Sequence, residues 1–240
     1  NSAKSGGAIY LSSNGITSTY ISSLNGEFKN NTAQEFGGAI ANNTVSNSAT
    51  AYSTIDKLSG TFAENHIVSN TNLSINGGAI YNGNYATISG ITGIFENNYV
   101  NETSSSSQAG CGGAIYNFIG TIGDISASFI CNNAKYGGAI SNYSGSIGNI
   151  TGYFEDNHAV QGGAIQVLYE SKLGDINANF VNNRIESQVS TGYGLGIEGG
   201  FFVSNSASSS SNASIGNING NFINNSFITN LTSHGYIKIY

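Results

Sequence analysis

The sequence lacks proline, methionine and tryptophan, and it carries few charges for its 240 residues. Charged residues make up 8% of the chain, whereas roughly 25% is usual for soluble domains. The seven Lys and Arg residues are scattered singly, so the cationic patch that nucleic-acid binding requires is missing. No apolar run approaches the ~18 residues of a membrane span. Because methionine is absent, we expect a mature or excised piece of a protein.

Cysteine is also scarce, and the composition disfavours helix. Cys111 and Cys131 are too few for a disulfide scaffold, and they form either one bridge or two free thiols. Glycine accounts for 33 residues, and each glycine in a helix costs roughly 1 kcal/mol relative to alanine. The short apolar stretches are β-branched or aromatic and are bounded by Gly, Asn and Ser, which is typical of strands.

A repeat runs through the whole chain. The block GGAI begins at Gly6, Gly37, Gly77, Gly112, Gly137 and Gly162, and a degraded version begins at Gly199. Each block is followed by a unit of the form I-x-x-I-x-x-x-F-x-x-N. Its first aliphatic column is Ile21, Ile55, Ile88, Ile122, Ile147, Leu173 and Ile215. Its second aliphatic column is Leu24, Leu58, Ile91, Ile125, Ile150, Ile176 and Ile218. The aromatic column is Phe28, Phe62, Phe95, Phe129, Phe154, Phe180 and Phe222. The amide column is Asn31, Asn65, Asn98, Asn132, Asn157, Asn183 and Asn225.

The copies of the repeat differ in length at only two places. The shortest copies, which begin at Gly112 and Gly137, are 25 residues long. Longer copies carry insertions near 41–54, 66–76, 99–111, 184–198 and 203–214. Insertions confined to two corners are typical of loops that leave a fixed frame. We therefore predict one repeat domain over residues 1–240.

These columns predict an all-β fold, a right-handed parallel β-solenoid of about seven three-stranded rungs. The expected strands lie around the GGAI block, the I-x-x-I segment and the Phe. Rungs stacked at ~4.8 Å would place equivalent residues above one another over about 34 Å. The aliphatic and Phe columns would then fill the core, and the seven Asn would form a ladder of side-chain amides. A second, partial ladder is expected at Asn42, Asn82, Asn117 and Asn142.

The alternating GGAI and F-x-x-N motifs resemble the passenger repeats of chlamydial polymorphic outer-membrane proteins and of related bacterial autotransporter adhesins. Six GGAI blocks and seven F-x-x-N motifs carry this resemblance over almost the whole chain. It implies a surface-exposed β-helix linked to adhesion, and hence an extracellular or cell-surface location.

Residues that could carry chemistry do not form a convincing site. Asp124 and Asp175 share a column two rungs apart, near 9.6 Å by rung spacing, at the upper limit for an inverting carboxylate pair. Asn149 alternates with them, which favours a structural role. His66 and His158 lie three rungs apart, too far for a shared metal site. The segment GLGIEG at 194–199 matches G-x-G-x-x-G but lies in an insertion, so we interpret it as chance. We expect no enzyme, no cofactor and no metal.

Two functions remain open on the sequence. The chain opens and closes on repeat segments without a capping helix, so it is either cut from a longer solenoid or stacks end to end on further copies. The favoured hypothesis is a structural, self-associating surface protein that forms a fibre. The alternative is an adhesin that binds host or cell-surface ligands through its insertions, with Tyr99 and Tyr193 as candidate contacts. A polysaccharide-degrading β-helix enzyme is the least favoured of the three.

Overall fold

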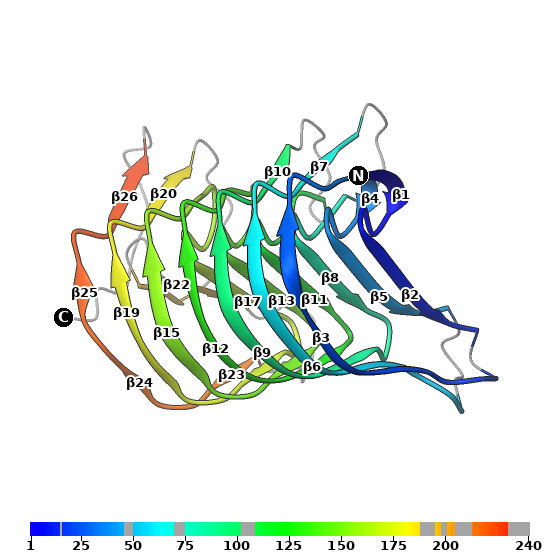
Figure 1. Cartoon of the computed structure of the whole chain (residues 1–240). Coiled ribbons are helices and arrows are strands. Elements are labelled where there is room, and N and C mark those ends of the chain that lie inside the picture. The colour runs from blue at the N-terminus through cyan, green and yellow to red at the C-terminus, as the bar shows by residue number, and fades with distance from the viewer. Residues whose placement is uncertain are drawn as a thin grey trace.

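The protein is a stack of parallel β-strands in the form of a rod (Figure 1). The computed structural model describes residues 1–14, 16–45, 50–69, 75–101, 109–187, 195–197, 201–204 and 213–229. These residues contain no helix, and every strand pair among them is parallel except β21 with β22. The structure therefore confirms a parallel β-solenoid, while its right-handed sense stays a prediction.

Each rung contributes a strand to three faces. The GGAI sheet is formed by β2 (Ile9–Ser13), β5 (Ile40–Thr44), β8 (Ile80–Gly83), β11 (Ile115–Phe118), β13 (Ile140–Tyr143), β17 (Ile165–Leu168), β22 (Phe201–Ser204) and β21 (Leu195–Ile197). The short sheet is formed by β1 (Ser2–Ser5), β4 (Thr32–Phe36), β7 (His66–Val68) and β10 (Tyr99–Asn101). It continues through bridges at Asn133 into β16 (His158–Ala159), β20 (Arg184–Ser187) and β26 (Ser226–Thr229).

The third face, the long sheet, corrects the predicted division of the rung. The I-x-x-I segment and the Phe belong to one continuous strand in β3 (Thr19–Lys29), β6 (Ser53–Ala63), β9 (Thr87–Glu96) and β12 (Thr121–Ile130). Later copies divide it into β14 (Ser146–Ile147) and β15 (Ile150–Glu155), β18 (Lys172–Leu173) and β19 (Ile176–Val181), and β23 (Ser214–Ile215), β24 (Ile218–Asn219) and β25 (Phe222–Ile223). The third strand of each rung instead follows the F-x-x-N turn.

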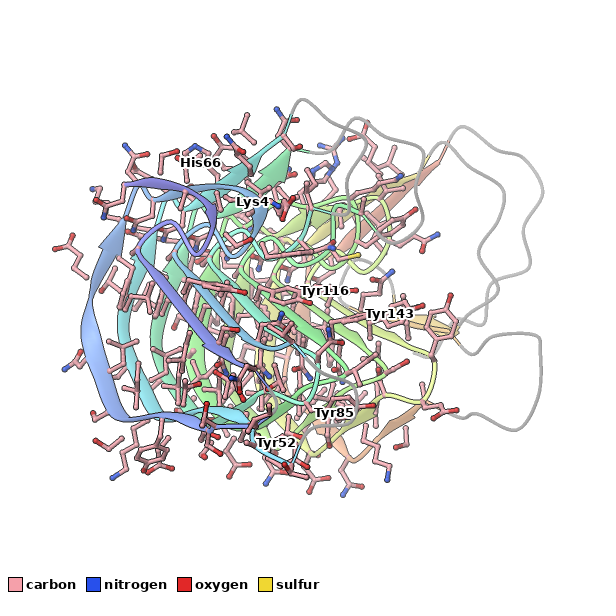
Figure 2. The ribbon with its side chains drawn as sticks, turned by 90° about the vertical axis from the view of Figure 1, so that its right-hand side faces the viewer. Lys4, Tyr52, His66, Tyr85, Tyr116 and Tyr143 are labelled. Atoms are coloured by element: carbon pink, nitrogen blue, oxygen red, sulfur yellow. The ribbon has the colours of Figure 1, made fainter. Side chains whose placement is uncertain are left out.

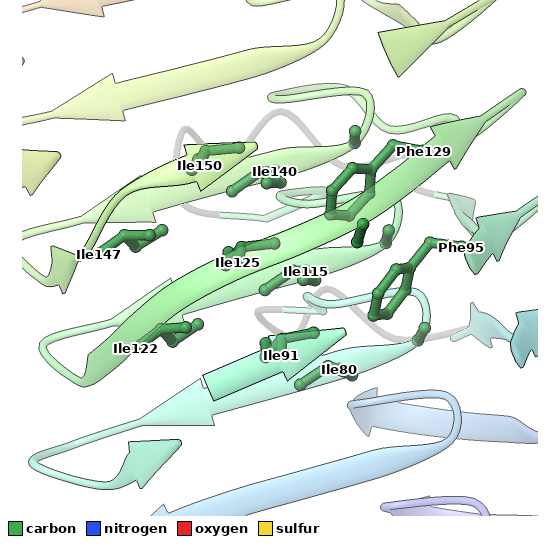
Figure 3. Close-up of a cluster of buried hydrophobic side chains, with 14 of the residues drawn as sticks. Ile80, Ile91, Phe95, Ile115, Ile122, Ile125, Phe129, Ile140, Ile147 and Ile150 are labelled. Carbon is green, nitrogen blue, oxygen red and sulfur yellow. The ribbon is translucent and has the colours of Figure 1, made fainter. Parts of the chain in front are cut away.

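The core lies between the GGAI sheet and the long sheet. Figure 3 shows isoleucines of the two sheets facing one another, with Phe95 and Phe129 at one side of the cluster. All seven Phe rings form one stack, with centroids 4.6–5.0 Å apart and planes within 12° of parallel. This spacing equals the ~4.8 Å separation of neighbouring strands, so the rings follow the backbone register.

The paired glycines of the GGAI block form the corner between the short sheet and the GGAI sheet. Gly37 has a φ of 60°, a left-handed conformation that favours glycine. A Cβ on Gly38 would overlap the carbonyl oxygen of Gly78 in the next rung. The first glycine is therefore required for the turn, and the second for the close approach of two rungs.

Each of the five predicted insertions contains residues outside the described part of the chain, namely 46–49, 70–74, 102–108, 188–194 with 198, and 205–212. Their described ends belong largely to strands. The insertions expected to begin at His66, Tyr99 and Arg184 open with β7, β10 and β20, so the fixed frame is longer there than the sequence pattern indicated. GLGIEG also lies partly outside the description, with its central residues in β21.

Candidate functional site

The F-x-x-N turn holds its asparagine in a buried position. The residue before each Asn has a positive φ between 51° and 56°, as at Asn97 and Cys131. This left-handed residue ends the long strand and turns the next side chain inward. Asn65, Asn98, Asn132, Asn157 and Asn183 are 0% exposed as a result.

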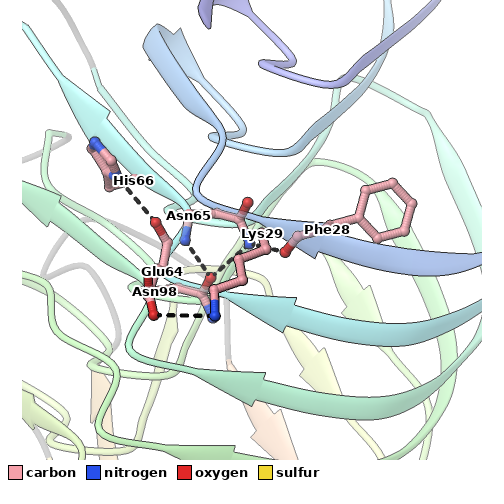
Figure 4. A network of polar contacts seen from close by, with 6 residues as sticks. All are labelled: Phe28, Lys29, Glu64, Asn65, His66 and Asn98. Atoms are coloured by element: carbon pink, nitrogen blue, oxygen red, sulfur yellow. Dashed lines mark hydrogen bonds and ion pairs between the residues drawn. The ribbon is translucent and has the colours of Figure 1, made fainter. Parts of the chain in front are cut away.

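These amides bond to one another along the rod axis. Figure 4 shows the arrangement around Asn65 and Asn98. Asn98 Nδ2 donates to Asn132 Oδ1 at 3.0 Å and to the carbonyl oxygen of Phe62 at 2.8 Å. Asn98 Oδ1 accepts from the side chain and the backbone N–H of Asn65, both at 3.0 Å. The ladder runs from Asn1 to Asn225 with Nδ2–Oδ1 distances of 2.9–3.0 Å.

A second amide ladder follows the GGAI block inside the rod. Asn42, Asn82 and Asn117 each donate through Nδ2 to the Oδ1 of the next member at 2.9 Å, and the ladder ends at Asn142. Val167 pairs with Asn142 in the following rung and offers no amide. Both ladders satisfy buried polar groups that would otherwise destabilise the core.

The column of Asp124 and Asp175 forms a third ladder on the outside of the long sheet. Asp124 Oδ1 accepts the backbone N–H of Asn149 at 2.8 Å, and Asn149 Oδ1 accepts the backbone N–H of Asp175 at 2.9 Å. Asp175 Oδ1 accepts the backbone N–H of Asn217 at 2.7 Å. Each carboxylate of the hypothetical acid–base pair thus bonds to the next rung through its Oδ1.

The remaining predicted site residues lie apart. The ring of Tyr99 stacks on His66, with centroids 4.7 Å apart, and 37% of Tyr99 is exposed. His158 approaches the Glu186 carboxylate at 3.5 Å. Tyr193 lies outside the described residues. Among the described residues, no group of three or more His, Cys, Asp or Glu side chains could hold a metal ion.

The two cysteines are not joined in a disulfide, which settles the choice that the sequence left open. Cys111 is buried, whereas Cys131 is exposed at the left-handed turn position. Partial burial, and then the carboxylates of Asp156 and its neighbours, raise the pKa of the Cys131 thiol. The thiolate is therefore disfavoured at neutral pH, which argues against a nucleophilic role.

An aromatic cluster outside the GGAI sheet was missed by the sequence analysis. Tyr81 and Tyr116 are 4% and 2% exposed and pack with Ala41 and Cys111. Burial raises the pKa of both phenols. Figure 2 shows Tyr116 and Tyr143 on this side of the rod. The signal was a tyrosine directly after GGAI at both positions, on the strand face opposite the core.

Residues 25–44 match the model of the Chlamydia polymorphic membrane protein (Chlamydia_PMP) repeat. This stretch contains one F-x-x-N turn and the GGAI block that follows it. The match confirms the resemblance inferred from the motifs, and it supports a cell-surface protein at a coarse level. No curated protein and no solved structure matches the chain. Within the part that the structure describes, no helix is long and apolar enough to cross a membrane.

Proposed function

We propose that the chain is a structural, non-enzymatic protein of a cell surface whose rungs stack end to end on a second copy. The observation that carries the proposal is the state of the first and last described rungs. Ile21 and Leu24 are only partly buried, whereas Ile55 and Leu58, one rung further, are 0% and 1% exposed. Phe222 is 39% exposed, whereas Phe180 is 0% exposed. One added rung at either end would bury these side chains.

Strand edges support the same proposal. Within the described residues β3 pairs only with β6, so its other edge offers unpaired backbone groups over eleven residues. The amide and Phe columns on that edge match those that any further rung of the same kind would present. At the opposite end, β21 covers β22 in antiparallel pairing, so stacking there involves the long and short sheets.

A substitution on the open edge tests this stacking. Thr19 donates its backbone N–H to Tyr52 in the second rung, and alternate residues of a parallel strand direct their N–H groups to opposite sides. The N–H of Tyr20 therefore points to the open edge, and Tyr20→Pro removes it without breaking a bond to β6. Tyr20→Ala is the matched control, because it removes the same ring and keeps the N–H.

We expect long unbranched fibres in negative-stain microscopy of the native protein and of Tyr20→Ala, and single particles for Tyr20→Pro. Monodisperse native protein at high concentration would reject stacking. Fibres that persist unchanged in Tyr20→Pro would show that association uses another surface.

Adhesion is the second candidate function, favoured by exposed aromatic residues on the first three rungs. Tyr10, Tyr20, Tyr52 and Tyr85 are 44–62% exposed, and Figure 2 shows Tyr52 and Tyr85 near each other at the lower edge of the view. Tyrosines amid Ser, Gly and Asn supply contact area at low entropic cost. Tyr52→Ser with Tyr85→Ser should weaken attachment to cells if the exposed tyrosines carry binding, and deletion of 102–108 and 188–194 should abolish attachment if the insertions carry it. Attachment that survives both deletions contradicts the role proposed for the insertions.

A further inference from the structure

A groove of about 680 Å³ runs along the outside of the long sheet, across the rungs. One wall is the column that begins at Ser23 and ends at Asp175, and the other is the column that begins at Ser59 and ends at Asn177. The groove therefore spans the first six rungs of the long sheet. Neither of the proposed functions uses it, because stacking involves the rod ends and adhesion the corner insertions.

Most side chains that line the groove are polar, and the three aliphatic ones, Leu58, Ile91 and Ile125, are each only 1% exposed. Thr92, Ser126 and Thr151 offer hydroxyl groups, and Asn149 and Asn177 offer amides. No aromatic residue is among those that line it. Such a surface gains little from contact with apolar side chains of a protein partner. It does suit a ligand that is itself covered with hydroxyl groups, since these both donate and accept hydrogen bonds.

The ladder on this wall fixes its polar groups before any ligand arrives. Asp124 and Asp175 each use Oδ1 to hold the backbone N–H of the next rung. Asp124 Oδ2 makes no hydrogen bond to the described residues, so it can accept from a ligand hydroxyl. Charge-assisted bonds of this kind are stronger than neutral ones, and preorganised groups lose little entropy on binding. With Lys57 as the single cation in the groove, two carboxylates disfavour an anionic ligand.

The repeat of the fold limits the shape of the ligand. Similar polar groups recur every ~4.8 Å along the axis, because each rung contributes one residue to each column. Only a polymer with its own short repeat can contact several rungs in equivalent ways. We propose that the groove binds a linear, uncharged polysaccharide that lies along the rod axis.

Gly90 allows the groove to be blocked without disturbing the rungs. A Cβ added at Gly90 would meet only the carbonyl oxygen of Asp124, at 3.8 Å, which is ordinary contact. Gly90→Tyr should therefore fold normally and place a ring in the groove. Gly90→Ala is the matched control, since it makes the same backbone change and leaves the groove open.

The experiment is isothermal titration calorimetry with two probes, a hexamer of β-1,4-linked glucose and a hexamer of galacturonic acid. We expect the glucose hexamer to bind the native protein and Gly90→Ala equally, and Gly90→Tyr at least about tenfold more weakly, or about 1.4 kcal/mol. Thermal unfolding should be the same for all three proteins. We expect no binding of the galacturonate hexamer.

Three results would overturn the proposal. The first is no heat of binding with millimolar glucose hexamer. The second is equal affinity of the native protein and Gly90→Tyr, which would place binding elsewhere. The third is a preference for the galacturonate hexamer, which would contradict the argument from charge. Fibre formation by the same samples, scored separately, keeps this test independent of end-to-end stacking.

Discussion

The long sheet is hydrogen bonded differently in two regions of the molecule. One region is the first four copies of the repeat, and the other is the last three copies. In the early copies the strand is continuous, and the residue before the second Ile pairs between Ser23 and Lys57 and between Gly90 and Asp124, although not between β6 and β9. In the later copies the strand is interrupted there, and an Asp or Asn side chain of the preceding rung accepts the backbone N–H. A side-chain ladder thus replaces part of the backbone ladder.

Glycine makes this exchange possible. The interrupted copies read Gly-Asn or Gly-Asp before the second Ile, at 148–149, 174–175 and 216–217. A Cβ on Gly148 would lie 2.5 Å from Asp124 Oδ1, and one on Gly174 would lie 2.7 Å from Asn149 Oδ1. The comparison shows that the columns shared by both regions maintain the fold, while one column changes its bonding without changing the register.

The largest expected effect concerns the shared Phe stack. Phe62→Ala lies in the continuous region and Phe154→Ala in the interrupted region, and each ring is 0% exposed between two stacked neighbours. We expect each to lower the free energy of unfolding by about 3–5 kcal/mol, because each leaves a large cavity. Urea denaturation measures the free energy of unfolding of both variants. A loss of unfolding free energy that is much smaller for Phe154→Ala than for Phe62→Ala would show that the interrupted region packs loosely.

The buried amide ladder is expected to matter nearly as much. Asn98→Leu and Asn157→Leu leave the preceding Asn, Asn65 or Asn132, without its acceptor and a Phe carbonyl without its donor. Each unsatisfied buried group costs about 1–3 kcal/mol, so we expect a loss of about 3 kcal/mol for either variant. The exposed Asn25→Ala is the control and should change stability by less than about 0.5 kcal/mol.

Gly174→Ala should distinguish the interrupted region from the continuous region by its effect on stability. Its Cβ would press on Asn149 Oδ1 and on the backbone of Gly148, so we expect a loss of about 1–3 kcal/mol from overpacking. Gly26→Ala in the first copy meets only the Phe28 ring, at 3.7 Å, and should be tolerated. Equal thermal stability of the two variants would contradict the steric account of the interruption.

The smallest effect on stability is expected at the third ladder, on the outside of the long sheet. Asp124→Ala removes the acceptor of the Asn149 N–H in a solvent-exposed position, and should cost less than about 1 kcal/mol. Asp124→Asn keeps an acceptor, as Asn149 does in the next rung, and should be close to native. If Asp124→Asn is as destabilised as Asp124→Ala in urea, charge and not hydrogen bonding maintains the ladder.

The repeating columns made most of the fold predictable, because a residue type that recurs at a fixed place in every rung has the same neighbours in every rung. The Phe and Asn columns were found in this way. The short sheet was missed because its inward residues, such as Ala33, Ile67 and Val100, are followed by segments of unequal length that hide the pattern. The groove could not be predicted, since its lining comes from two columns over six rungs in which the residue type varies from rung to rung.

The central claim is that consecutive repeats pair in parallel and in register, and directed disulfides test it most directly. Thr92 pairs with Ser126 in the next rung, whereas Thr151 lies one rung further. In a Cys131→Asn background, Thr92→Cys with Ser126→Cys should oxidise rapidly to an intramolecular disulfide, because Cα atoms ~4.8 Å apart suit the bond. Thr92→Cys with Thr151→Cys, at ~9.6 Å, should not. Bridging of the second pair but not the first would contradict the register on which this account depends.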